Sequence, residues 1–210
     1  MKINAILLSL SLVVATTSSF GQIRTYGIKL GAIAAKQTWQ YSSPFGQRPT
    51  VNRWGVDVGI FLEWPSISFI SISTEVHFTE RGMAEEFRPI NPLPEGSGNI
   101  ITFSREIDYL SLPVLFKIRY DGDEIELYAL TGPRLDVKLG TREQPDLPYE
   151  GFRDVGLGLT FGGGIIINRL LSGHDLGLEL RLSPTFGSEY STPDVDVTSK
   201  SMELLFVLEL

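Results

Sequence analysis

The sequence contains no cysteine and only two histidines, His77 and His174. Without cysteine the chain cannot form disulfides, thiolate metal sites or the lipid-modified N-terminus of a bacterial lipoprotein. With so few histidines we also expect no metal site and no bound cofactor. Packing and hydrogen bonds must therefore hold the fold together.

Clustered positive charge is also missing. The formal net charge is −7 and Lys and Arg form no dense group, so we expect no nucleic-acid partner. No apolar run long enough for a membrane-spanning helix follows the N-terminal segment. The length of 210 residues, with 42% hydrophobic and 20% charged residues, indicates one ordered domain with a sizeable core.

The N-terminal segment MKINAILLSLSLVVATTSSFGQ has the features of a secretory signal peptide. Lys2 precedes an apolar stretch at positions 6–14, and small residues stand at Ser19 and Gly21. We expect cleavage after Gly21, which gives a signal peptide at 1–21 and one barrel domain at 22–210. The alternative is a buried helix or a membrane anchor, for which the apolar stretch is short.

Long segments of the chain alternate between apolar and polar residues. In YLSLPVLFKIRYDGDEIELYALTGPRLDVKLG (109–140), apolar side chains occupy every second position on both sides of a tight Asp-Gly turn. A period of two predicts β-strands. These strands are longer than the about five or six residues usual in soluble proteins, and reach the about nine to eleven that a tilted membrane-spanning strand needs.

The alternation predicts eight strands, and the segments that connect them are alternately long and short. Short connections join strands 2–3, 4–5 and 6–7, whereas the long ones (40–52, 82–104, 141–152, 188–199) are rich in Pro, Gly, Ser and acidic residues. This order predicts an all-β fold, an eight-stranded antiparallel up-and-down transmembrane β-barrel with short periplasmic turns. The expected strands are 26–38, 53–64, 68–80, 105–120, 124–140, 153–168, 175–187 and 200–210.

Trp54 and Trp64 stand at the two ends of one apolar strand face. Ten residues at about 3.3 Å each, tilted by about 40°, rise about 25 Å, which is the height of the apolar band of an outer-membrane barrel. We expect both tryptophans at the membrane interfaces. A pair of core aromatics in a soluble barrel is the alternative.

Alternation alone does not say which face lies inside. An eight-stranded barrel has room inside only for side chains or one small ligand, so the large apolar sets belong outside and the Gly, Ser and paired charges inside. We expect an interior polar network made of Asp57, Glu75, Lys117, Arg119, Arg134, Asp136, Glu179, Arg181 and Glu203. Further inward candidates are Lys29, Glu63, Glu126 and Asp154, with apolar Leu115, Leu130 and Ile166 on the same face. Pairing of opposite charges makes such burial tolerable.

The segments YGIKLGAIAA, EVHFTERGM, YLSLPVLFKIRY, LYALTGPRL and MELLFVLEL, in this order, resemble the small PorT-like outer-membrane β-barrel proteins common in Bacteroidota. The resemblance covers the chain after the signal peptide and implies an eight-stranded barrel, with a role in a type IX secretion apparatus for PorT itself. Two strand prolines, Pro113 and Pro133, cannot donate ladder hydrogen bonds. The resemblance implies that they are tolerated family features, with bulges at these positions.

Three motifs allow a chemical interpretation. Gly162–Gly164 lacks the Lys-Ser/Thr and the helix of a phosphate-binding loop, so it is expected to give room in a strand. Ser73, Glu75 and His77 share a strand face and could form a hydrolase site, although same-face neighbours lie about 6.6 Å apart, too far for direct bonds between short side chains. The acidic segments 83–87 and 194–196 could bind a divalent cation, but solvated loops explain them as well.

These patterns predict a monomeric, non-enzymatic protein of the outer membrane with a structural, binding or accessory role in the cell envelope. Its expected partners are membrane lipid, the barrel-assembly machinery and an envelope or secretion-system protein that contacts the long loops. Two alternatives remain open, a soluble lipocalin-like barrel that binds a hydrophobic ligand and a lipid-modifying outer-membrane enzyme.

Overall fold

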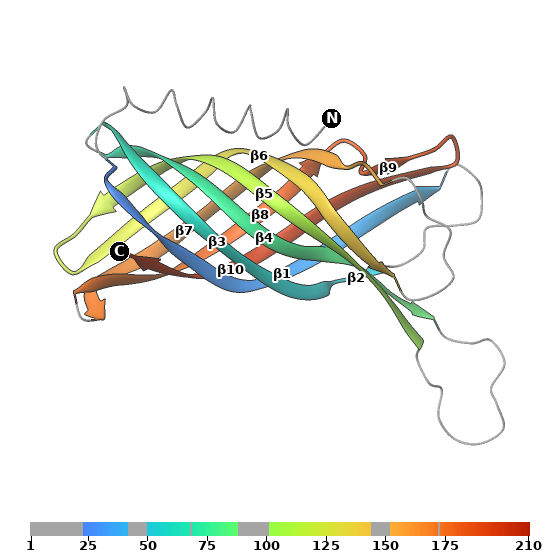
Figure 1. Ribbon diagram of the computed structural model, residues 1–210, viewed down its shortest axis with the longest axis horizontal. Coiled ribbons are helices and arrows are strands. Elements are labelled where there is room, and N and C mark those ends of the chain that lie inside the picture. Colours follow the sequence, from blue (N-terminus) through green and yellow to red (C-terminus); the bar gives the residue numbers. More distant parts are fainter. Residues whose placement is uncertain (1–22, 42–49, 68, 88–100, 144–151, 172) are drawn as a thin grey trace, which may run out of the picture.

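The computed structural model describes residues 23–41, 50–67, 69–87, 101–143, 152–171 and 173–210. Eight long strands form the wall of a barrel (Figure 1). They are β1 (Thr25–Tyr41), β3 (Arg53–Ile67), β4 (Ile70–Phe87), β5 (Ile101–Asp121), β6 (Ile125–Glu143), β7 (Val155–Leu171), β8 (His174–Phe186) and β10 (Val195–Glu209). Two short strands, β2 (Thr50–Val51) and β9 (Tyr190–Ser191), pair with β4 and β10.

The wall closes on itself. Neighbouring long strands pair antiparallel in chain order, and β1 also pairs with β10, from Gly27 opposite Glu209 to Tyr41 opposite Val195. The prediction of an eight-stranded antiparallel up-and-down barrel is confirmed. No helix among the described residues is long and apolar enough to cross a membrane.

Side chains alternate between the two surfaces of the wall along most of each long strand. In β3, Val58, Ile60 and Leu62 are exposed, whereas the intervening positions 57, 59, 61 and 63 are buried. The other long strands follow the same rule, so an apolar band covers the outside and the charged face lies inside. A lipocalin-like barrel would need the opposite arrangement, with its apolar face inward. The structure therefore speaks against the soluble alternative.

The barrel has two different ends. The β5–β6 hairpin and the C-terminus lie at one end, whereas β2 and β9 lie at the other (Figure 1). Close hairpin turns join β3 to β4, β5 to β6 and β7 to β8 at the first end. In outer-membrane barrels short turns face the periplasm, so we call this the periplasmic end and the opposite end extracellular.

Several strands are longer than their sequence patterns predicted. β4 and β5 remain paired to Phe87 opposite Ile101, inside the segment 82–104 that was predicted as a loop. The acidic segment 83–87 therefore belongs to a strand, and so does most of 194–196, since β10 begins at Val195. Cross-strand backbone hydrogen bonds continue beyond the point at which apolar alternation stops, because polar residues pair equally well where the wall leaves the bilayer.

The expectation of bulges at the strand prolines is wrong. β5 and β6 keep one register from Pro113 opposite Arg134 to Phe116 opposite Thr131, and Pro133 pairs with Leu159 without a shift. The register shift between β5 and β6 lies instead between Asp108 and Tyr109. A missing N–H removes single ladder bonds, which requires no extra residue in the strand.

Candidate functional site

A cluster of buried charges crosses the middle of the barrel interior. The Lys29 ammonium of β1 lies 2.8 Å from Glu75 Oε1 of β4 and 3.0 Å from Glu179 Oε2 of β8. Arg181 of β8 pairs with both carboxylates, reaching Glu75 Oε2 at 2.7 Å. Tyr128 donates its hydroxyl to Glu179 at 2.6 Å. Two cations and two carboxylates thus tie β1, β4 and β8 together through the lumen, and the Tyr128 hydroxyl adds β6.

Glu75 also joins Ser73 and His77. Ser73 Oγ donates to Glu75 Oε1 at 2.9 Å, and His77 Nε2 lies 2.9 Å from Glu75 Oε2. The expectation that these neighbours are too far apart for direct bonds is wrong, because the longer glutamate side chain bends towards both. His77 bonds to Asp57 through Nδ1. The glutamate, not the histidine, contacts the serine, so the direct serine–histidine contact of a hydrolase pair is not present here.

A second layer of charges lies towards the extracellular end. Asp136 accepts from Arg81 Nη1 at 2.7 Å, from Arg134 Nε at 3.0 Å and from Ser111 Oγ at 2.6 Å. Glu203 lies 4.0 Å from Arg134 Nη1 and accepts hydrogen bonds from two serines, Ser183 and Ser201. Buried carboxylates here are shared between guanidinium and hydroxyl donors, which satisfies most of their lone pairs.

A third layer closes the interior towards the periplasmic end. Glu63 pairs with Lys117 at 3.2 Å and with Arg119, and Arg119 also bonds to Glu126 at 2.9 Å. The Lys117 ammonium lies 3.8 Å from the centre of the Tyr128 ring. This aromatic contact links the third layer to the central one.

The residues predicted for the polar network all lie in the interior and are buried: Asp57, Glu75, Lys117, Arg119, Arg134, Asp136, Glu179, Arg181 and Glu203. Asp154 was also expected inside, and this is wrong. It precedes β7 and its side chain is 87% exposed. Arg81 was missed, although it continues the alternation through Ser73, Glu75 and His77 to the next inward positions.

The predicted interface tryptophans lie on the outer wall of β3. Trp54 is 68% exposed near the extracellular end. Trp64, nearer the periplasmic end, is partly buried and donates its indole N–H to Thr74 Oγ1 at 3.1 Å.

Glycines give room to the largest inward side chains. A Cβ on Gly59 would meet the His77 ring at 2.5 Å, and one on Gly164 would meet the Tyr128 ring at 2.4 Å. The glycine run at 162–164 lies in β7. Gly164 leaves space there for the Tyr128 ring, so the run gives room in a strand, as the sequence indicated. The remaining void between the central and third layers measures about 10 Å³, enough for about one water molecule. The lumen is filled by side chains at this level.

Aromatic side chains close the extracellular end. Phe152 lies 6.4 Å from Trp39 and 5.5 Å from Tyr190, measured between ring centres. Ile107 and Val197 belong to the same buried cluster. We call these residues, together with Met83, Tyr109 and Val195, the aromatic cap.

One buried carboxylate, Glu189, lies outside the strands, in the segment between β8 and β9. It accepts hydrogen bonds from Ser199 Oγ and from Gln37 Nε2. No basic side chain pairs with it among the ion pairs of the described residues. Burial raises the pKa of the Glu189 carboxyl above its ordinary value, partly offset by the hydrogen bond from Ser199.

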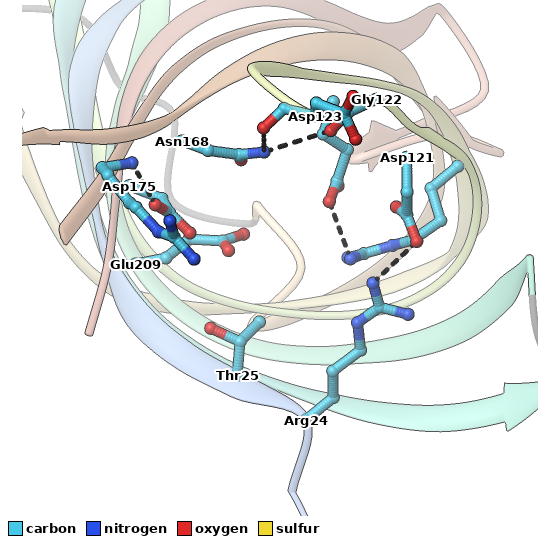
Figure 2. A pocket seen from close by; sticks show the side chains of 11 residues that line it. Arg24, Thr25, Asp121, Gly122, Asp123, Asn168, Asp175 and Glu209 are labelled. Carbon is cyan, nitrogen blue, oxygen red and sulfur yellow. Dashed lines mark hydrogen bonds and ion pairs between the residues drawn. The ribbon is translucent and has the colours of Figure 1, made fainter. Parts of the chain in front are cut away.

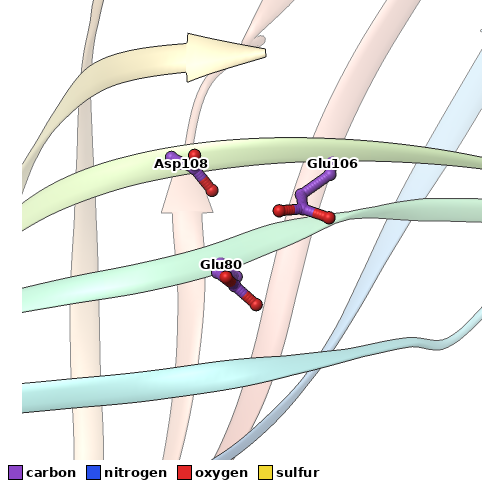
Figure 3. A group of neighbouring side chains, drawn as sticks. All are labelled: Glu80, Glu106 and Asp108. Atoms are coloured by element: carbon purple, nitrogen blue, oxygen red, sulfur yellow. The ribbon is translucent and has the colours of Figure 1, made fainter. Parts of the chain in front are cut away.

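A group of three carboxylates lies on the outer wall near the extracellular end. Glu80 of β4 and Glu106 and Asp108 of β5 lie close enough for their oxygens to share one ion (Figure 3). Two guanidiniums already pair with two of these three carboxylates, however. Arg142 forms ion pairs with Glu106 at 2.7 Å and with Asp108 at 3.3 Å, and Arg53 pairs with Glu106 as well. The arrangement is an ion-paired surface cluster.

An apolar outer band around a closed, charge-filled interior defines a transmembrane β-barrel. Residues 20–191 match the family described as outer membrane protein beta-barrel domain. The chain belongs to this family, and it is a protein of the outer membrane.

Solved outer-membrane barrels are similar to this chain at low sequence identity. Neisserial surface protein A is 14% identical, with 88% of this chain and 96% of that chain covered and a TM-score of 0.46. Ail, the attachment invasion locus protein of Yersinia pestis, is 13% identical, with 90% and 100% covered and a TM-score of 0.40. AlkL is 12% identical, with 91% and 90% covered and a TM-score of 0.47. No curated protein matches the sequence.

Proposed function

We propose that this protein is a non-enzymatic accessory protein of the cell envelope, anchored in the outer membrane by its barrel. The filled interior carries this proposal. Charges from β1, β4 and β8 meet across the lumen, and only about one water molecule fits between the central and third layers. A barrel closed in this way serves as a rigid anchor, and its functional surfaces are its two ends.

An enzymatic role has little support from Ser73, Glu75 and His77, the candidate residues taken from the sequence. Ser73 and His77 are both buried, and Glu75 lies between them. A lipid or ester substrate has no path to Ser73 from the bilayer, since the side chain points into the packed interior. We therefore rank the lipid-modifying enzyme below the accessory role.

The finer assignment is an accessory role in protein secretion. It rests on the resemblance of five segments, from YGIKLGAIAA to MELLFVLEL, to PorT-like proteins. In this proposal the barrel acts as a monomer, the barrel-assembly machinery inserts it, and a secretion-system or other envelope protein contacts one of its ends.

Reconstitution in planar lipid bilayers tests the central claim. We expect no stepwise conductance from the folded parent barrel, and no ester hydrolysis above that of a His77→Ala variant. Stable single-channel steps, or hydrolysis that His77→Ala abolishes while the barrel remains folded, would contradict an anchor without transport or catalysis.

The secretion role needs a separate experiment in the source cell. Deletion of the gene should leave secretory cargo in the periplasm, and a plasmid copy should restore export. Unchanged export in the deletion strain would remove the secretion assignment and leave the anchor proposal standing.

A further inference from the structure

The periplasmic end of the barrel contains an open cavity of about 660 Å³ (Figure 2). Its lining comes from the chain before and at the start of β1, from the β5–β6 and β7–β8 hairpins and from the end of β10. Five carboxylates face it, together with three guanidiniums. The carboxylates are Asp121, Asp123, Glu126, Asp175 and Glu209, and the guanidiniums are Arg24, Arg119 and Arg169.

The buried floor of this cavity has more negative than positive groups. Glu126 and Glu209 are only 7% and 8% exposed, and Glu63 lies behind them. The cations in contact with these three carboxylates are Lys117 and Arg119. One carboxylate is thus left without a cation of its own, in a place where an unpaired charge is costly.

Two carboxylate oxygens at the floor also lack a hydrogen-bond donor. Glu126 Oε1 and Glu209 Oε1 are buried and accept no hydrogen bond from the described residues. Lys117 lies 3.5 Å from the first oxygen and 3.8 Å from the second, so it approaches both without bonding to either. Buried polar atoms in native proteins normally have a partner, and the open side of the cavity is where a partner can enter.

The guanidiniums at the rim do not supply this donor. Arg24 is 3.1 Å from Asp121, and Arg119 is held by Glu63 and Glu126. Arg169 is exposed at the β7–β8 hairpin and bonds to Asp175 through its backbone N–H. None of these contacts supplies a hydrogen bond to Glu126 Oε1 or to Glu209 Oε1.

We propose that the periplasmic cavity binds an organic cation, a primary ammonium or guanidinium group that donates to Glu126 and Glu209. A metal ion fits less well, because the only group of three acidic side chains among the described residues with oxygens close enough to share an ion lies on the outer wall. Such a cationic group is carried by a free polyamine or by a Lys or Arg side chain of a periplasmic protein. The inference does not depend on the secretion role.

The experiment is an NMR titration of the folded full-length mature barrel in detergent micelles. The probes are spermidine, a short neutral peptide with one central lysine, the same peptide with norleucine in its place, and magnesium chloride. We expect spermidine and the lysine peptide to shift the backbone amides of Gly122 and Asn168, which line the cavity, and the norleucine peptide to shift neither.

Two variants test the floor and one serves as a matched control. Glu209→Gln and Glu126→Gln should each weaken binding about tenfold, the loss expected for one charge-assisted hydrogen bond. Glu124→Gln removes the same charge from the β5–β6 hairpin, but the Glu124 side chain is exposed and does not line the cavity. This variant should therefore bind spermidine and the lysine peptide as tightly as the parent does. The mobility shift on boiling in SDS gels verifies that each variant is folded. If Glu209→Gln does not fold, a folded Glu126→Gln is enough for the test.

The outcomes separate the sources of the cation. Tighter binding of the lysine peptide than of spermidine identifies a protein side chain as the ligand, and the reverse identifies a free polyamine. Any of three results would overturn the proposal. The first is that neither spermidine nor the lysine peptide shifts the amides, and the second is that the two Gln variants bind them as tightly as the parent does. The third is that magnesium causes shifts as large as those from spermidine.

Discussion

The inner and outer surfaces of the barrel wall are built by adjacent residues of the same strands, yet they differ in chemistry. In β8, Glu179 and Arg181 are almost completely buried inside, whereas Leu180 between them is 50% exposed on the outer wall. Outside, each side chain contacts lipid, which accommodates any apolar shape. Inside, each charged group depends on particular partners from distant strands. On the outer wall, any substitution that keeps the side chain apolar should therefore be tolerated. In the interior, a substitution should be tolerated only where the new side chain keeps the partners of the old one.

The largest expected effect comes from removing a shared carboxylate inside. Glu75→Gln keeps the shape of the side chain but leaves Lys29 and Arg181 with one carboxylate between them. Loss of one partner from a buried ion pair costs about 3–5 kcal/mol. Urea unfolding in lipid vesicles, followed by tryptophan fluorescence, measures this change in the free energy of unfolding.

Glu80→Gln is the matched control for that variant. Glu80 lies in the same strand but faces outward, and its replacement should change stability by no more than about 0.5 kcal/mol. Equal effects of the two substitutions would show that the inner surface depends on polarity alone, and the distinction between the surfaces would fail.

A charge on the outer wall should have the next largest effect. Leu180→Arg places a guanidinium in the apolar band and should cost about 2–4 kcal/mol if this position is near the bilayer midplane. Leu139→Arg, near the extracellular end of β6, should cost about 0–1 kcal/mol, since such costs fall towards the interface. A Leu180→Arg barrel as stable as the parent in the same urea titration would contradict the lipid-facing assignment.

The smallest expected effect on stability comes from Glu189, a buried carboxylate at the extracellular end of the barrel. Because burial raises the pKa of Glu189, the folded state holds this proton more tightly than the unfolded state. Both states are protonated at low pH, and folding loses stability as the pH rises through the raised pKa. Glu189→Gln should therefore stabilise the extracellular end at about pH 8 and have no effect at about pH 3.

Trp39 of the aromatic cap reports this local change. In a Trp54→Phe, Trp64→Phe background it is the remaining tryptophan of the chain, so its fluorescence follows the extracellular end alone. A stabilisation by Glu189→Gln that is equally large at both pH values would show that hydrogen bonding, and not ionisation, limits the stability of this region.

The sequence predicted the surfaces of the wall better than its contacts. Alternation placed Glu179 and Leu180 on opposite faces, because the period of a strand does not depend on the rest of the fold. The contact between Glu75 and Arg181 could not be predicted in this way, since it depends on the axial stagger between β4 and β8 around a closed wall. Asp154 followed the alternating pattern but lies outside it, because β7 begins one residue later, at Val155.

The aromatic cap was missed for a related reason. Trp39, Phe152 and Tyr190 come from three segments without clear alternation, at or beyond the predicted strand ends. Each looks like an isolated aromatic residue at a loop until closure brings the ends of β1, β7 and β9 together. The unpaired oxygens of Glu126 and Glu209 are likewise visible only when the two hairpins and β10 surround one cavity.

The pairing of β1 with β10 also determines how the protein must fold. Gly27 meets Glu209, so the contact that completes the wall joins residues from nearly opposite ends of the polypeptide. Such high contact order makes closure slow relative to the formation of hairpins between consecutive strands. Until closure, the strands at both margins expose unpaired backbone groups that can recruit another chain. The kinetic problem for this barrel is therefore to keep its first and last strands from pairing with other molecules before they meet each other.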